Sequence, residues 1–165
     1  MATIDLASRA GDGVNFVAKT SGVKIPYVIG KEINLATAVT TKGTALAQGD
    51  VIEALDLPAG CMILAGGALK VTAMTGTSTD LTFDIGITGG DVDNIIDGWE
   101  FDGAAVGSYA TPLGVQEPVV VSTADTLDIL FTTQTNTVTG GKIWVYAVVV
   151  DIRPTENPGI AALQS

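Results

Sequence analysis

The sequence predicts an all-β protein, a β-sandwich of short strands joined by tight turns. Three observations support this fold class. Apolar and polar residues alternate with a period of two in several stretches, and Gly, Pro, Asn and Asp interrupt the chain about every ten residues. No convincing stretch repeats apolar residues at helical spacing, and 165 residues suit one domain.

Strands are expected where the alternation is strongest. Residues 81–88, "LTFDIGIT", alternate strictly, which is typical of a strand with one buried and one solvated face. Only "DNIIDGW" could form a short turn of helix. The other strands are expected at 24–29, 32–37, 50–57, 67–75, 118–121, 126–132 and 142–151.

The strand expected at 142–151, "KIWVYAVVVD", is apolar on both faces. Such a strand needs cover on both sides, either at the centre of the domain or from another subunit. One of its faces is therefore a candidate oligomer interface. It comprises Trp144, Tyr146, Val148 and Val150.

The two ends of the chain differ in composition from the middle. Residues 1–22 are small, polar and mildly basic, and residues 153–165 include two prolines. Segments of this kind bury little unless a partner holds them. The sequence thus predicts an extended N-terminal arm at 1–22, a sandwich domain at 23–152 and a C-terminal tail at 153–165.

The net charge of −10 is unevenly distributed. Residues 1–42 hold five basic and three acidic residues, a balance of +2, whereas the remainder holds three basic and fifteen acidic residues, a balance of −12. Nucleic-acid binding requires clustered Lys and Arg to neutralise phosphates. The acidic body therefore predicts no nucleic-acid partner.

Cysteine content and hydropathy bear on the compartment. Cys61 is the single cysteine, so no internal disulfide can form, which fits a reducing compartment. The sequence starts with no basic and apolar leader, and its longest apolar runs are far below the ~20 residues of a membrane helix. We expect a soluble, unexported protein with no membrane partner.

The sequence offers no catalytic constellation. It has no histidine, which removes the commonest general base and the commonest metal ligand. The nucleophile and phosphate-loop patterns GxSxG, GxxxxGK[ST] and GxGxxG are also missing. We expect no enzyme activity, no catalytic residue and no cofactor.

An acidic stretch between 91 and 102 is the one candidate for a metal site. Counted from Asp91, the pattern of an EF-hand calcium loop fails at its fifth, sixth and twelfth positions. We therefore expect a solvated loop with no metal, in which Trp99 and Phe101 pack back onto the sheet. The acids are Asp91, Asp93, Asp97, Glu100 and Asp102.

Two segments resemble a known family. Residues 50–109, which begin "DVIEALDLPAGCMILAGG", and the later "TLDILFTTQTNTVTGGKIWVYAVVVDI" are similar to head decoration, or cement, proteins and other small virion proteins of tailed bacteriophages, marine ones especially. The resemblance covers about two thirds of the chain. It implies a jelly-roll-like sandwich that sits as a homotrimer on the capsid surface and has no catalytic residues.

The resemblance implies a function and a location. The chain would decorate and stabilise a phage capsid, with the major capsid protein and itself as partners, after synthesis in the host cytoplasm. A tail- or fibre-associated virion protein is one alternative. Another is a calcium-dependent carbohydrate-binding β-sandwich module.

If the chain binds a capsid, the N-terminal arm is the expected contact because it belongs to the only part with a positive balance. An arm that orders on binding can cover a wide surface. The alternative is that residues 14–18 form the first strand of the sandwich. Candidate contacts are Ile4, Leu6, Val14 and Phe16 as apolar anchors, with Arg9 and Lys19 supplying charge.

Overall fold

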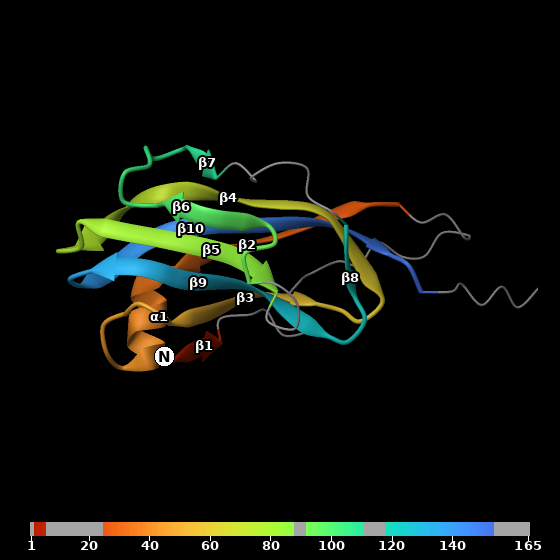
Figure 1. Ribbon diagram of the computed structural model, residues 1–165, viewed down its shortest axis with the longest axis horizontal. Coiled ribbons are helices and arrows are strands. Elements are labelled where there is room, and N and C mark those ends of the chain that lie inside the picture. The colour runs from red at the N-terminus through yellow and green to blue at the C-terminus, as the bar shows by residue number, and fades with distance from the viewer. Residues whose placement is uncertain (1, 6–24, 88–91, 111–117, 154–165) are drawn as a thin grey trace, which may run out of the picture.

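A computed structural model of the chain describes residues 2–5, 25–87, 92–110 and 118–153, which form two five-stranded sheets and one short helix (Figure 1). Sheet A contains, in spatial order, β1 (Thr3–Asp5), β3 (Val51–Leu57), β9 (Asp125–Thr135), β5 (Asp80–Ile87) and β6 (Ile96–Glu100). Sheet B contains β2 (Tyr27–Asn34), β10 (Val138–Asp151), β4 (Cys61–Gly76) and β7 (Tyr109–Ala110), and β8 (Val119–Val121) also pairs with β4.

The strand pairing is that of a jelly roll. Strand β2 pairs with β10, β3 with β9, β4 with both β7 and β8, and β5 with β6, all antiparallel. Strands β2, β3 and β4 thus pair with strands much later in the chain, and the chain alternates between the sheets from β1 to β5, as in a long hairpin wrapped into a sandwich. The predicted all-β, jelly-roll-like fold is confirmed.

The core lies between the two sheets. Its largest side chains include Phe83, Phe101 and Phe131, which are fully buried. The ring of Phe83 lies 4.8 Å from that of Phe131, edge-on, and 5.1 Å from that of Phe101. Aliphatic residues fill the remainder, as expected of a chain with 5% aromatic content.

The region 24–37 differs from the two strands expected there. A single strand, β2, spans Tyr27–Asn34 and passes through residues 30 and 31, which separate the two expected strands. The helix α1 (Leu35–Lys42) follows directly. The Oδ1 atom of Asn34 accepts a hydrogen bond from the Ala36 N–H at 2.9 Å, which caps the first turn.

The other end of α1 is closed by Gly43. Its φ of 78° is the left-handed conformation that glycine adopts at helix C-termini, and its N–H donates to the carbonyl of Val39. Leu35 and Ala38 are buried and fix the helix to the sandwich. Among the described residues, no helix is long or apolar enough to cross a membrane.

Two further expectations need correction. "DNIIDGW" contains most of the strand β6, and not a turn of helix, because Ile96 pairs with Ile85 and Trp99 with Phe83 of β5. The strand expected at 67–75 is longer, since β4 begins at Cys61 and continues through Gly66 and Gly67. These glycines lie inside the strand and not in a turn.

The start of the chain is not wholly an arm. Residues Thr3–Asp5 form β1, which pairs in parallel with β3 at the edge of sheet A. Ile4 is 2% exposed and belongs to the core. The rest of the predicted arm, 6–22, lies outside the described residues, as do residues 154–165 of the predicted tail.

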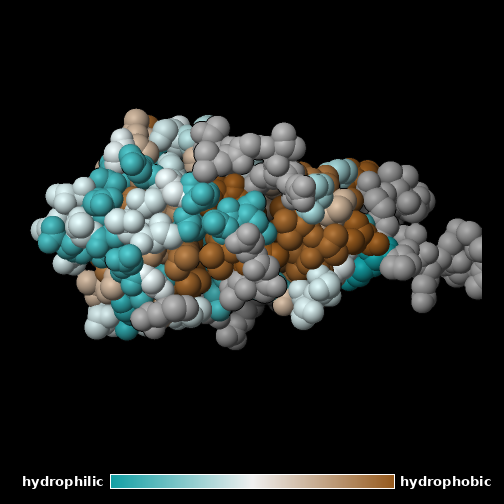
Figure 2. Space-filling view, viewed as in Figure 1, coloured by the Kyte–Doolittle hydropathy of each residue, from teal (hydrophilic) through white to brown (hydrophobic). Residues whose placement is uncertain are grey.

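The surface is unevenly polar along the length of the molecule. On the face seen in Figure 2, hydrophobic residues gather toward β8, whereas the opposite end is mainly hydrophilic. Val120 of β8 is 53% exposed.

Candidate functional site

Strand β10 carries the predicted oligomer interface, and it lies between β2 and β4 in sheet B. Its inward residues, such as Ile143 and Val145, are fully buried in the core. On its outward side Trp144 is exposed, and Tyr146 and Val148 are half-buried. Val150 is 7% exposed and is therefore not available at a surface for an interface, which corrects its assignment to the predicted face.

The predicted capsid contacts fall in different places. Ile4 is a core residue, which corrects its assignment to a free arm, because a buried side chain has no surface to offer a partner. Leu6, Arg9, Val14, Phe16 and Lys19 lie outside the described residues.

Asp50 explains why the first residues of the chain dock onto sheet A. Its buried carboxylate accepts hydrogen bonds from the N–H groups of Ala2, at 2.9 Å, and Ala47, at 2.8 Å. The Nζ of Lys42, at the end of α1, donates to the same carboxylate. Burial alone would raise the pKa of Asp50, but these donors together hold the pKa below its ordinary value.

In the fold, two acids of the acidic stretch lie close to a third acid that is outside the stretch. Carboxylate oxygens of Asp84, Asp93 and Asp97 all lie within 4.8 Å of one another, and we call these residues the acidic cluster. Asp84, on β5, is buried, whereas Asp97, on β6, is exposed. Asp91 lies outside the described residues.

Asp84 also has a structural role in the acidic cluster. Its Oδ1 accepts a hydrogen bond from the Gly98 N–H at 2.8 Å and so links β5 to β6. Burial raises the pKa of Asp84, and the negative charge of Asp97 raises it further. Three carboxylates could contribute oxygen ligands to Ca²⁺, which takes six to eight. Exposed acids also gather without an ion, so metal independence remains a prediction.

The other acids of the stretch differ in their surroundings. The carboxylate of Asp102 accepts a hydrogen bond from the Leu81 N–H at 3.0 Å, while Glu100 is exposed. Phe101 is fully buried, and its ring meets that of Trp99 edge-on at 5.3 Å. The expected packing of this aromatic pair against the sheet is confirmed.

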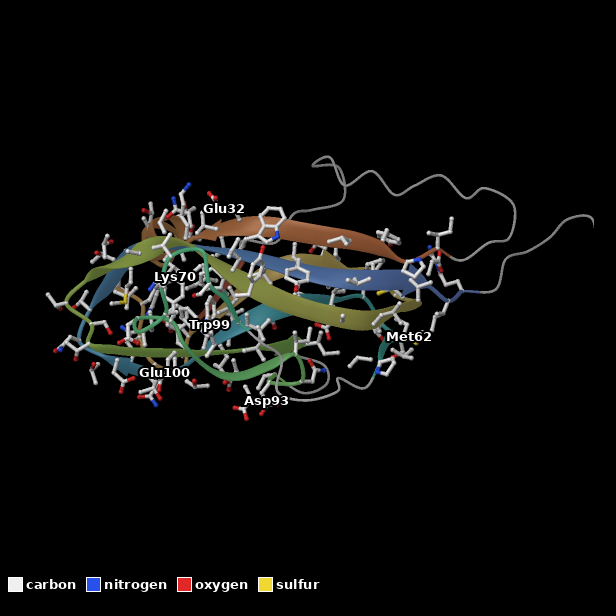
Figure 3. The ribbon with its side chains drawn as sticks, turned by 90° about the horizontal axis from the view of Figure 1, so that it is seen from above. Glu32, Met62, Lys70, Asp93, Trp99 and Glu100 are labelled. Atoms are coloured by element: carbon white, nitrogen blue, oxygen red, sulfur yellow. The ribbon has the colours of Figure 1, made fainter. Side chains whose placement is uncertain are left out.

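Lys70 is a buried cation that the sequence reasoning missed. It lies on β4, and its Nζ donates to the carbonyls of Phe101, at 2.5 Å, and Ala104, at 2.7 Å. The same Nζ lies 4.6 Å from the centre of the Phe101 ring. Burial lowers its pKa, and the Asp102 charge opposes this. Lys70 thus ties the turn after β6 to sheet B (Figure 3). The available signal was a lone Lys inside the apolar run "GALKVTA".

Asp128 is a buried acid that the sequence also did not predict. It lies on β9 opposite Glu53 of β3 and is 2% exposed. Its pKa is raised to about 7, mainly by burial and further by the charges of Glu53 and Asp125. The hydroxyl of Thr126, which donates to the carboxylate at 2.6 Å, partly opposes this shift. In "TLDILFT" the period of two sets Asp128 on the side opposite Leu127, Ile129 and Phe131, so its burial was not expected from the sequence.

Comparisons with known proteins bear on the fold. No protein-family model and no curated protein sequence matches the chain. A chain of the capsid of Ralstonia phage GP4 superposes with a TM-score of 0.56 at 17% identity, over 92% of this chain and 99% of that one. A chain of the cyanophage Pam1 capsid asymmetric unit superposes with a TM-score of 0.53 at 15% identity, over 87% and 96% of the two chains. At these identities the likeness is one of fold.

Proposed function

We propose that the chain is a non-enzymatic virion protein that decorates and cements the capsid of a tailed bacteriophage. The observation that carries this proposal is the end-to-end likeness of fold. The superpositions span at least 87% of this chain and 96% of each capsid chain, so no large extra domain separates them. The likeness therefore concerns whole subunits, which favours a common kind of role.

A cementing role, in place of a role in the shell itself, is supported by the sequence. The quoted segments resemble decoration proteins, and the acidic body of the chain suits an exposed, soluble surface. In this proposal the chain acts on the outer capsid surface as a homotrimer, with the major capsid protein as its partner.

The capsid contact belongs, in this proposal, to the part of the arm that follows β1. Ile4 is excluded because it is buried, which leaves Leu6, Val14 and Phe16 as apolar anchors and Arg9 and Lys19 as charges. Deleting residues 1–12 would also remove β1 from sheet A. Substitutions therefore test the contact more cleanly than a deletion does.

Sedimentation with undecorated capsids of the phage tests the proposal. The unaltered chain should bind until its sites are filled, and a variant with Arg9→Glu and Lys19→Glu should bind more weakly because two attractive charges become repulsive. Val106→Glu, which adds a negative charge at an exposed position outside the arm, should leave binding unchanged. Failure of the unaltered chain to bind would overturn the cementing role, whereas equal binding of the arm variant would overturn only the arm contact.

The acidic cluster favours one alternative, a calcium-dependent carbohydrate-binding module. That function requires the ion for folding or for sugar binding, so it predicts a calcium requirement that a cement protein of this fold does not need. The chelator experiment below distinguishes the two.

A further inference from the structure

The outward residues of sheet B form a continuous apolar surface. The strands β2, β10 and β4 lie side by side, and their registers align outward residues in rows across the sheet. One row is Val28–Val148–Ala65, the next is Gly30–Tyr146–Gly67, and the third is Glu32–Trp144–Leu69. We call these residues the outer face of sheet B.

Two glycines of the outer face of sheet B lie directly under its aromatic side chains. A Cβ atom on Gly30 would lie 2.6 Å from the Trp144 ring, and one on Gly67 would lie 2.8 Å from the Tyr146 hydroxyl. Both aromatic side chains therefore lie down over neighbouring strands, where aromatic rings compensate for glycines in sheets. Trp144 therefore covers Gly30 of β2, and Tyr146 covers Gly67 of β4.

This surface is open to solvent. Val28 is 64% exposed and Trp144 is 38% exposed. Tyr109 of β7, which lies opposite Leu69, extends the third row and is 65% exposed. Large contiguous apolar patches on a soluble protein mark interaction sites.

The charge distribution indicates which partner fits. The single charged residue of the outer face of sheet B is Glu32, and Lys142 neutralises it at 2.5 Å. Sheet A, in contrast, presents Asp97 and Glu100, and Figure 3 shows Glu100 on the side of the molecule opposite Glu32. Two copies of a chain with a net charge of −10 repel each other through their acidic sides and can meet closely at a neutral one.

We infer that the outer face of sheet B is where a second copy of this chain docks. This surface is where the self-association of the proposed function would take place. The inference rests on the proposed function only for the number of copies, which is three. In the proposed function the arm after β1 contacts the capsid, so the outer face of sheet B stays available to a second copy. Association buries Val28 and Trp144, which are exposed, together with Val148, which pairs with Val28 and is half-buried.

Light scattering coupled to size exclusion tests the inference on the full chain. The unaltered protein should have a mass of two or three times 16.8 kDa at micromolar concentration. Val28→Glu and Val148→Glu should each give a monomer, because they bury an unpaired charge at the interface. Val106→Glu is the matched control, since Val106 is 58% exposed in the turn before β7, and it should keep the mass of the unaltered protein.

A variant without added charge guards against misfolding. Gly30→Ala should lift the Trp144 ring and lower the association constant about tenfold or more, with an unchanged far-ultraviolet circular dichroism spectrum. A monomeric unaltered protein would overturn the inference. So would folded Val28→Glu, Val148→Glu and Gly30→Ala variants that all keep the full mass. A mass of two chains supports the interface and contradicts only the trimer, and capsid binding is measured separately.

Discussion

Asp50 holds together three segments that are distant along the chain. The N-terminal residues, the end of α1 and the turn before β3 all donate to its buried carboxylate. Asp50→Ala leaves two backbone N–H groups and the Lys42 ammonium without this acceptor. We expect the free energy of unfolding to fall by about 3 kcal/mol, the cost of breaking a buried charge pair.

Urea unfolding measures this loss. Glu32→Gln is the matched control because the Glu32–Lys142 pair is about 40% exposed at both side chains, and its loss should cost less than about 1 kcal/mol. Equal stability of Asp50→Ala and the unaltered protein would show that the carboxylate does not anchor β1.

Asp128 predicts how stability depends on pH. Its pKa is raised from 3.8 to about 7, so between these values the folded state binds a proton that the unfolded chain releases. Stability from this group is therefore present at low pH and is lost as the pH rises toward and past 7. Asp128→Asn keeps an acceptor for the Thr126 hydroxyl and has no charge to bury.

Melting temperatures between pH 4 and 8 test this prediction. The difference between Asp128→Asn and the unaltered protein should grow in favour of the variant as the pH rises. Thr132→Ser, a neutral change on the same strand, should show no such pH-dependent difference. A variant that parallels the unaltered protein at every pH would contradict the assigned pKa.

At the scale of elements, local patterns predicted the long strands and missed α1. Leu35–Lys42 contains β-branched Thr and Val, which have low helix propensity, and the alternation in 32–37 favoured a strand. The caps were visible as Asn34 and Gly43, eight residues of helix apart. The segment forms a helix because Leu35 and Ala38 are buried against the sandwich. Tertiary packing of this kind cannot be predicted from helix propensity.

The sites were less predictable than the strands, because they join elements far apart in sequence. The acidic cluster adds Asp84 of β5 to residues near β6, and Lys70 of β4 reaches the turn after β6. Neither contact follows from spacing along the chain. The outward positions Trp144, Tyr146 and Val148 of β10, in contrast, follow from a period of two within one strand, whereas Val150 of the same predicted face is buried.

The β5–β6 pair carries the prediction of metal independence. Asp84 accepts the Gly98 N–H, so the buried member of the acidic cluster is held by the backbone. We expect EDTA to leave the melting temperature unchanged, since removal of a ligand lowers stability only if the folded state binds it. Asp93→Asn removes one carboxylate of the acidic cluster. Its melting temperature should likewise be the same with EDTA and with Ca²⁺.

A fall of several degrees in EDTA that Ca²⁺ reverses would contradict this prediction. It would favour the carbohydrate-binding alternative. If the Ca²⁺ effect is then lost in Asp93→Asn and kept in Glu100→Gln, the ion binds in the acidic cluster.

For the whole molecule, period and turn chemistry predicted a sandwich, whereas the strand order came only from the structure. Pairing β2 with β10 joins residues more than 100 positions apart, such as Val28 and Val148, and no local pattern encodes that contact. The consequence is a closed subunit with an acidic side and a neutral apolar side. Such a division suits a protein that associates with itself and remains soluble.

Heat disruption of capsids is the most direct test of the cementing role. Capsids of the phage would be prepared with and without this chain, and the release of packaged DNA would be followed by dye fluorescence during heating. We predict that capsids without the chain release DNA at a lower temperature, and that adding the purified protein restores the higher one. Identical release temperatures with and without bound chain would contradict the proposal that it cements the shell.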